Sequence, residues 1–230
     1  AGANGQTLRY DNLKAYDASG AELDAKMIYN SSQVVIQVDD RDAAYPITID
    51  PLIYLDQKVI ALGGAAADEF GYSVAISGDT ALVGALKSNG GQGSAYVFIR
   101  SNNTWGQQAK LTASDGAAGD NFGCSVALSG DTALVGATND GIGANMFQGS
   151  AYVFIRSGAT WTQQQQLFAS DGAAVDSFGY SVAISGDTAL VGATGSNVGA
   201  DGSQGAAYIF IRSGTIWAQQ AKLTASDGAD

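Results

Sequence analysis

Three nearly identical stretches recur along the chain: FGYSVAISGDTALV at residues 70–83, FGCSVALSGDTALV at 122–135 and FGYSVAISGDTALV at 178–191. Gly-Ala and a variable loop follow each stretch. GSAYVFIRS (93–101), GSAYVFIRS (149–157) and GAAYIFIRS (205–213) come next, each ahead of a Trp and a Gln-rich segment. Repeats with a period of about 20 to 50 residues are typical of solenoids and propellers. The repeat, rather than any single residue, therefore decides the fold class.

One unit of the repeat contains four predicted strands. Residues 72–77 alternate large and small side chains, which predicts a strand, and Gly78-Asp79 predicts a two-residue turn into a second strand at 80–85. Residues 94–100 are apolar on both faces and predict a buried third strand, and 105–113 predict a more polar, outermost fourth. This predicts an all-β protein with three complete four-stranded antiparallel blades of a β-propeller. A β-solenoid is the alternative, although its coils are shorter and more uniform.

The motifs also resemble a known family. Phe-Gly, then Val-Gly-Ala, then Ala-Tyr-Val-Phe in this order resemble bacterial FG-GAP repeats, which are related to the β-propeller of integrin α subunits. The resemblance covers residues 53–230. In better-known members a calcium loop of type Asp-x-Asp-x-Asp-Gly lies between the first two strands. Here that place holds only Ser-Gly-Asp, at 77–79, 129–131 and 185–187. One carboxylate cannot supply the roughly six oxygens that calcium requires, so we expect no metal there.

The first part of the chain lacks the repeat. Residues 1–52 predict a small β-module, with strands at 34–38 and 45–49, and residues 53–230 predict the blades. Within the second part, 53–64 align with an outer strand that has lost its own blade. The complete repeats follow, at 65–116, 117–172 and 173–228. Because an unpaired apolar edge is an aggregation hazard, we expect the 53–62 strand to pair with polypeptide outside this sequence or with another copy of the chain through open blade edges.

Composition excludes several classes of function. The chain has 230 residues, no His and one Cys, which removes His-dependent triads, His-ligated metal sites and Cys clusters. Its formal charge is −11, so a phosphate backbone would be repelled and we expect no nucleic-acid partner. No apolar run of about 18 residues occurs, so we expect no membrane insertion. Nearly every acid belongs to the repeat, which is typical of scaffold residues, and we expect no enzyme, no catalytic residue and no cofactor.

The variable loops at 138–148 and 194–204 are the candidate binding sites, because their sequence varies on a constant scaffold. Neutral surface loops would vary in the same way. The candidate partner-binding residues are Asn139, Asp140, Asn145, Met146, Phe147, Asn197 and Asp201.

The other repeated residues have simpler structural interpretations. We expect the Phe of each Phe-Gly pair (Phe70, Phe122, Phe178) to pack between blades, and each third-strand Arg (Arg100, Arg156, Arg212) to form a salt bridge. The acids before Phe-Gly (Asp68, Asp120, Asp176, with Asp115 and Asp171 further back) could bind calcium, but turn chemistry is favoured. Cys124 replaces a strand Tyr, which indicates a buried thiol rather than a nucleophile.

These observations favour a non-catalytic extracellular or cell-surface protein, for binding or adhesion, that contacts a protein or glycan through blade-connecting loops. The alternative is a structural subunit of an extracellular fibre or sheath.

Overall fold

The computed structural model describes residues 7–10, 13–30, 33–50, 53–198 and 202–226. By its internal contacts the chain divides into two units, residues 1–59 and 60–230. Every regular element among the described residues is a strand, apart from one helical turn, α1 (Ser88–Gly91). The all-β prediction is therefore confirmed, and the two units are described separately.

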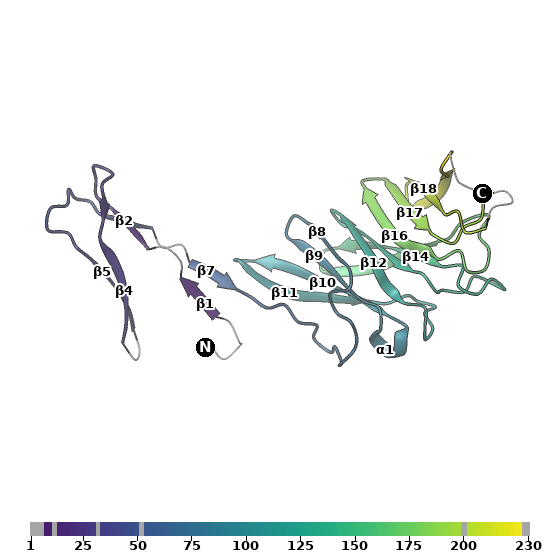
Figure 1. Ribbon diagram of the computed structural model, residues 1–230, viewed down its shortest axis with the longest axis horizontal. Helices are drawn as coiled ribbons and strands as arrows, with labels where there is room; N and C mark the ends of the chain where they lie inside the picture. The colour runs from purple at the N-terminus through teal and green to yellow at the C-terminus, as the bar shows by residue number, and fades with distance from the viewer. Residues whose placement is uncertain (1–6, 11–12, 31–32, 51–52, 199–201, 227–230) are drawn as a thin grey trace. The chain divides into compact units, whose positions relative to one another are not determined.

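The first unit consists of short strands (Figure 1). Three of them form one sheet in the order β3-β2-β6, and two more form a hairpin, β4-β5. Their bounds are β2 (Lys14–Tyr16), β3 (Glu22–Leu23), β4 (Ala25–Asn30), β5 (Gln33–Val38) and β6 (Thr48–Asp50). The predicted strand at 34–38 is present as β5, whereas the strand predicted at 45–49 begins only at Thr48.

The partner predicted for the segment after residue 52 was wrong. Only β7 (Ile53–Asp56) is a strand, and it pairs antiparallel with β1 (Thr7–Tyr10) of the same chain, with Thr7 opposite Asp56. A segment near the start of the chain thus supplies hydrogen bonds to β7, in place of outside polypeptide or another copy.

Leu62 nevertheless lies where the alignment with the later repeats places it. The backbone N–H of Leu62 donates to Gln107 Oε1 at 2.7 Å. Ser114 N–H to Gln163 (2.9 Å) and Ser170 N–H to Gln219 (2.9 Å) are the same contact in the next two repeats. The loop before each Phe-Gly pair therefore takes the same position in all three repeats, even though the strand before the first one differs.

The second unit contains three four-stranded antiparallel sheets, here called blades 1, 2 and 3 (Figure 1). Blade 1 is β8 (Val74–Ser77), β9 (Thr80–Ala85), β10 (Ser94–Ser101) and β11 (Thr104–Leu111). Blade 2 is β12 (Phe122–Ser129), β13 (Thr132–Ala137), β14 (Ser150–Ser157) and β15 (Thr160–Leu167). Blade 3 is β16 (Phe178–Ser185), β17 (Thr188–Ala193), β18 (Ala206–Ser213) and β19 (Ile216–Leu223). Each blade is a simple meander, as the sequence predicts.

Among the described strands, each fourth strand pairs only with the third strand of its own blade, as predicted. In blade 1 Arg100 lies opposite Trp105 and Tyr96 opposite Lys110, and the other two blades repeat this register. The described sheets remain three separate blades and do not join into a closed ring.

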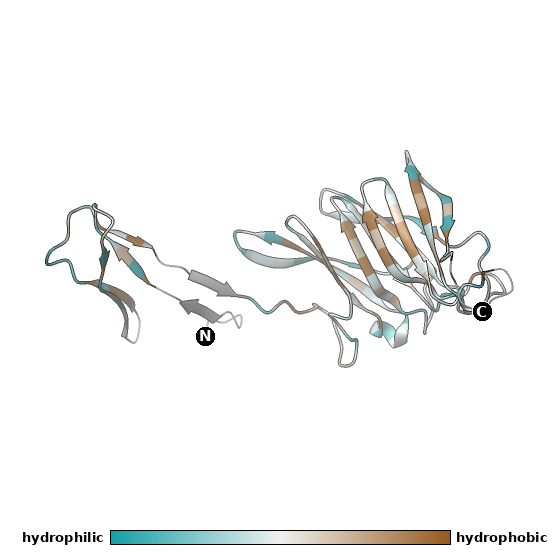
Figure 2. Cartoon of the chain, turned by 45° about the horizontal axis from the view of Figure 1, so that its top comes forward, coloured by the Kyte–Doolittle hydropathy of each residue, from teal (hydrophilic) through white to brown (hydrophobic). Residues whose placement is uncertain are grey.

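The blades pack face to face. One buried cluster joins Leu82 and Val97 of blade 1 to Val126 and Tyr152 of blade 2, and an equivalent cluster joins blades 2 and 3. Bands of apolar residues cross the strands of each blade (Figure 2). Side chains on a strand point alternately to the two faces of the sheet. Blade 2 therefore contributes one face to its interface with blade 1 and the other face to its interface with blade 3.

The Phe-Gly and Val-Gly-Ala motifs meet at these interfaces. A Cβ on Gly84 would lie 2.0 Å from the carbonyl oxygen of Gly123, and one on Gly136 would lie 2.1 Å from that of Gly179. Gly123 and Gly179 also have φ near +90°, which L side chains rarely adopt. Because Gly84 and Gly136 have no side chain, the backbone of the next blade can pack directly against them. This close contact explains why the repeat has glycine at these positions.

Phe122 and Phe178 fill the interfaces between blades, as predicted, whereas Phe70 of blade 1 is half-buried. Phe122 is fully buried, with its ring edge-on to Tyr152 (centroids 5.5 Å apart) and to Phe154 (6.0 Å), and Phe178 repeats the arrangement in blade 3. In blade 1 the first strand begins later, at Val74. Parallel bridges from Gly93 and Gly149 of the preceding blade fix the starts of β12 and β16, and the described residues place no blade ahead of β8.

Candidate binding surface

The variable loop of blade 2 is braced by the segment that leads into blade 3. Val175 N–H donates to the carbonyl of Met146 (2.9 Å), and Ser177 N–H donates to that of Phe147 (3.2 Å). The amide of Asn145 donates to the carbonyl of Gly172 at 3.1 Å. Two loops from adjacent blades are therefore held together as one surface.

Apolar side chains are exposed on this surface. Met146 exposes 66% of its area, and Phe147 and Val175 are also exposed. We call these three residues the loop-end patch. Sequence reasoning selected Met146 and Phe147 but missed Val175. The signal was present, because Val175 stands where the other repeats have Ala67 and Gly119.

Asp140 was predicted as a binding residue, and the structure places it beneath the loop. Its carboxylate is buried and accepts hydrogen bonds from Ser150 Oγ (2.5 Å), Tyr152 Oη (2.8 Å) and Gln166 Nε2 (2.8 Å). Asp140 therefore anchors the start of the loop to the blade and does not face a partner directly.

The remaining candidates are dispersed. Asn139 is half-buried, and so is Asn145, whose amide is used within the loop. Asn197 is exposed in the blade 3 loop, where its side-chain oxygen accepts the N–H of Ser203 at 2.8 Å. Asp201 lies outside the described residues. Of the predicted set, the structure brings together Asn145, Met146 and Phe147.

Beneath the patch, blade 2 differs from its neighbours in charge. Tyr152 Oη lies 2.9 Å from Asp115 Oδ1 and 2.8 Å from Asp140 Oδ2, and Gln166 Nε2 donates to it at 2.9 Å. Burial is the main cause that raises the pKa of the Tyr152 phenol. Burial also raises the pKa of nearby Asp120, and the charges of Asp140 and Asp115 add to this rise.

Blades 1 and 3 place a lysine where blade 2 has Gln166. Lys222 Nζ lies 2.8 Å from Asp171 Oδ2, and this hydrogen bond lowers the pKa of Asp171. In blade 1, Lys110 lies over the ring of Tyr96, 5.4 Å from its centroid. Blade 2 alone therefore combines two carboxylates with a neutral side chain at this position.

We expect Gln166→Lys to raise the free energy of unfolding at pH 7 by about 1 kcal/mol, because an ammonium would bond to Asp115 and Asp140 and the gain exceeds its desolvation cost. Equilibrium urea unfolding measures the change. Since a carboxylate with a lowered folded pKa contributes stability above its unfolded pKa, the gain should vanish as the pH falls below about 3. The reciprocal Lys222→Gln should lose a similar amount; a gain in both variants would contradict the charge argument.

The repeated acids before Phe-Gly act in turns, as predicted. The carboxylates of Asp68, Asp120 and Asp176 each accept the backbone N–H three residues before them, at 2.8, 2.6 and 2.8 Å. Among the described residues no group of three or more acidic, Cys or His side chains could hold a metal ion.

The predicted arginine salt bridges are confirmed. Arg156 Nε donates to Asp131 Oδ1 at 2.6 Å, and its guanidinium lies over Trp161, 5.5 Å from the ring centroid. Arg100 with Asp79, and Arg212 with Asp187, form the same pair. The single carboxylate of each Ser-Gly-Asp turn is thus bound to an arginine.

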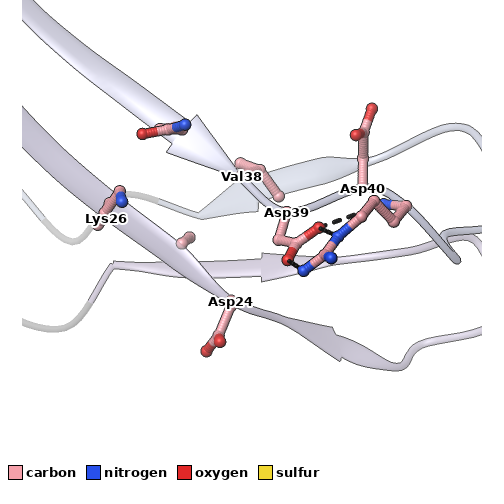
Figure 3. Close-up of a pocket in the computed structure, with 8 residues that line it drawn as sticks. Asp24, Lys26, Val38, Asp39 and Asp40 are labelled. Atoms are coloured by element: carbon pink, nitrogen blue, oxygen red, sulfur yellow. Dashed lines mark hydrogen bonds and ion pairs between the residues drawn. The ribbon is translucent and has the colours of Figure 1, made fainter.

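Two other sites lack the chemistry of a functional centre. Cys124 is half-buried, and burial raises the pKa of its thiol, whereas a nucleophilic thiolate needs a lowered pKa. A hollow in the first unit is lined by Asp24, Lys26, Asp39 and Asp40 (Figure 3). Arg41 binds Asp39 there and lowers its pKa to about 2. The carboxylates of Asp24 and Asp40 point away from this pair, so the charged side chains of the hollow do not converge on a common site.

Comparison with known proteins agrees with this architecture. A sequence model described as FG-GAP repeat matches residues 55–98, 105–154 and 161–210. No curated protein matches the chain. No helix among the described residues is long and apolar enough to cross a membrane.

The matched stretches are offset from the sheets. The second one begins in β11 of blade 1 and ends in β14 of blade 2, so each match spans a boundary between blades. The motif glycines and phenylalanines that define the match are the residues that pack at this boundary. Since the three matches cover more than half of the sequence and agree with the packing of the blades, the chain belongs to the FG-GAP repeat family.

Proposed function

We propose that this chain is a non-catalytic binding protein that contacts a protein or glycan partner through the loop-end patch. The observation that carries the proposal is an exposed apolar cluster, Met146, Phe147 and Val175, on a loop that departs from the repeat and is braced by the next blade. Apolar and aromatic side chains held in a fixed position are the usual anchors of recognition. FG-GAP repeats are related to integrin-like binding domains, and the family is generally non-enzymatic, which supports the same conclusion.

We place this binding outside the cell or on its surface. A low pI and a composition with few Lys suit an extracellular protein, and the family typically occurs in extracellular domains. The acidic surface also disfavours nucleic acid and anionic membranes as partners. Independence from calcium between the first two strands stays a prediction.

The test compares three proteins on an array of glycans and an array of purified extracellular proteins. The loop variant combines Met146→Ser with Phe147→Asn, since the φ of +58° at residue 147 suits Asn. The control is Ile216→Ser, because Ile216 is as exposed as Met146, at 66%, but is the first residue of β19 in blade 3. We expect the loop variant to bind about tenfold more weakly and the control to bind normally. A ligand that the loop variant binds as tightly as the unmodified protein would contradict the proposal.

The second candidate function is a structural subunit of an extracellular fibre or sheath. It is favoured by apolar residues that are exposed on the two terminal blade faces, Val74 and Ile76 on blade 1 and Leu190 on blade 3. Electron microscopy of native material that showed ordered polymers, together with no ligand on either array, would favour this function over the first.

A further inference from the structure

Each boundary between blades joins two different faces. We call the face that carries the motif Phe the leading face, and the opposite face, which carries the Gly of Val-Gly-Ala, the trailing face. At both internal boundaries the trailing face of one blade covers the leading face of the next. The chain therefore contains the same interface twice, with equivalent residues on each side.

Blades 1 and 3 each leave part of one of these faces exposed among the described residues. On the leading face of blade 1, Tyr96 and Phe98 are buried against Phe70, and the exposed part lies on the first strand. On the leading face of blade 1, Val74 exposes 70% of its area, whereas the equivalent Val126 of blade 2 exposes 9%. On the trailing face of blade 3, Leu190 exposes 39%, whereas the equivalent Leu134 exposes 0%. Ile76 and Leu223 are exposed in the same way. The exposed parts of both faces are apolar. At the two internal boundaries, the residues equivalent to one exposed part pack against the residues equivalent to the other.

We propose that the leading face of blade 1 binds the trailing face of blade 3 of a second copy of this chain. The occupant is a second copy because the exposed residues of one face have equivalents that pack against the equivalents of the other face at both internal boundaries. The outer part of the leading face is already occupied within the chain, where Leu62 N–H donates to Gln107 Oε1, so the second copy contacts the inner part of that face. The contact is face to face, unlike the edge pairing that the sequence suggested. It does not use the loop-end patch, so it goes beyond the proposed function.

The internal boundaries specify the contacts of the new one. Ser73 Oγ donates to the Gly123 carbonyl at 2.8 Å, and Ser125 Oγ donates to the Gly179 carbonyl at 2.6 Å. The equivalent hydroxyl at blade 3 is that of Ser181, and its acceptor is the carbonyl of Gly71 in the second copy. Gly192 leaves room for this carbonyl, because the nearest atom to a Cβ there is the Ser181 hydroxyl and no backbone of another blade lies against it.

A polar contact at the rim repeats as well. Arg156 Nη1 donates to Thr80 Oγ1 at 3.0 Å across the first boundary, and Arg212 Nη1 donates to Thr132 Oγ1 at 3.3 Å across the second. The next pair in this series is Arg100 of one copy with Thr188 of the other, and both residues are exposed. The proposed boundary thus has apolar contacts, a hydrogen bond to a backbone carbonyl and an arginine–threonine hydrogen bond, each equivalent to a contact at the two internal boundaries.

Two copies supply six blades, which lies within the roughly four to eight blades of closed propellers. A heterologous contact of this kind gives a ring when its rotation closes and a filament when it does not. We expect the closed arrangement, a two-fold dimer with two copies of the same boundary.

The test is the mass of the full chain in solution, by analytical ultracentrifugation up to about 100 µM. The unmodified protein should form dimers, whereas Val74→Asp (leading face) and Leu190→Asp (trailing face) should each be monomeric. Both residues are exposed in the single chain, so both variants should fold, which circular dichroism and urea unfolding verify.

An equimolar mixture of the two variants gives the sharpest result. Each variant retains the face that the other lacks, so the mixture should recover a dimer with one intact boundary and nothing larger. The Met146→Ser, Phe147→Asn variant is the matched control and should associate normally, which separates this proposal from the proposed function. An unmodified protein that stays monomeric at the highest concentration, or variants that still associate on their own, would overturn the proposal.

Discussion

Replacing Phe122 by alanine should lower the free energy of unfolding by about 4 kcal/mol, because it removes a fully buried ring and leaves a cavity between two blades. The ring contacts Tyr152 and Phe154 edge-on and lies in the cluster that joins blade 2 to blade 1. Equilibrium unfolding in urea, monitored by tryptophan fluorescence, measures the loss.

The matched control is Phe70→Ala. Phe70 makes the same two ring contacts within its own blade, to Tyr96 and Phe98, but it is only half-buried. Its loss should be about 2 kcal/mol, provided that the protein is dilute enough to be monomeric. Equal losses at the two positions would mean that the motif Phe stabilises only its own blade and not the boundary.

The blades could be predicted from the sequence because their signals are local. Alternation with a period of two and the Gly-Asp turn at 78–79 each specify structure within a few residues, and the repeat multiplies the signal by three. The residues that contact each other across a boundary between blades could not be predicted in the same way. That Gly84 faces Gly123 depends on the stacking of two sheets, which no local pattern encodes.

The error at residues 53–62 has a related cause. Alignment with the strand that contains Trp105 assigned a structure by position in the repeat, whereas β7 pairs with β1, more than 40 residues earlier in a part of the chain without repeats. Long-range strand pairing is specified by burial and register rather than by local sequence. The position of Leu62 could be predicted by alignment, because the same backbone contact occurs at Ser114 and Ser170 in the later repeats.

The candidate site was predicted in part for the same reason. Met146 and Phe147 break the polar character of their loop, and this departure located the exposed patch correctly on blade 2. Asp140 looked like a loop residue, and its burial follows from Tyr152 and Gln166 on the next two strands. Comparison with the equivalent residues of the neighbouring blades shows which departures from the repeat are exposed and which are buried.

Replacing Gly136 by alanine should lower the free energy of unfolding by about 3 kcal/mol, since the new methyl group would lie 2.1 Å from the Gly179 carbonyl and force blades 2 and 3 apart. The matched control is Gly192→Ala, the equivalent position in blade 3, where the nearest atom is the rotatable hydroxyl of Ser181. Its loss in dilute, monomeric protein should be below about 1 kcal/mol, because a hydroxyl can move and a backbone carbonyl cannot. Urea unfolding of both variants separates the two cases. Similar losses at Gly136 and Gly192 would show that the Val-Gly-Ala glycine is required by its own strand; a loss confined to Gly136 would show that it is required by the approach of the next blade.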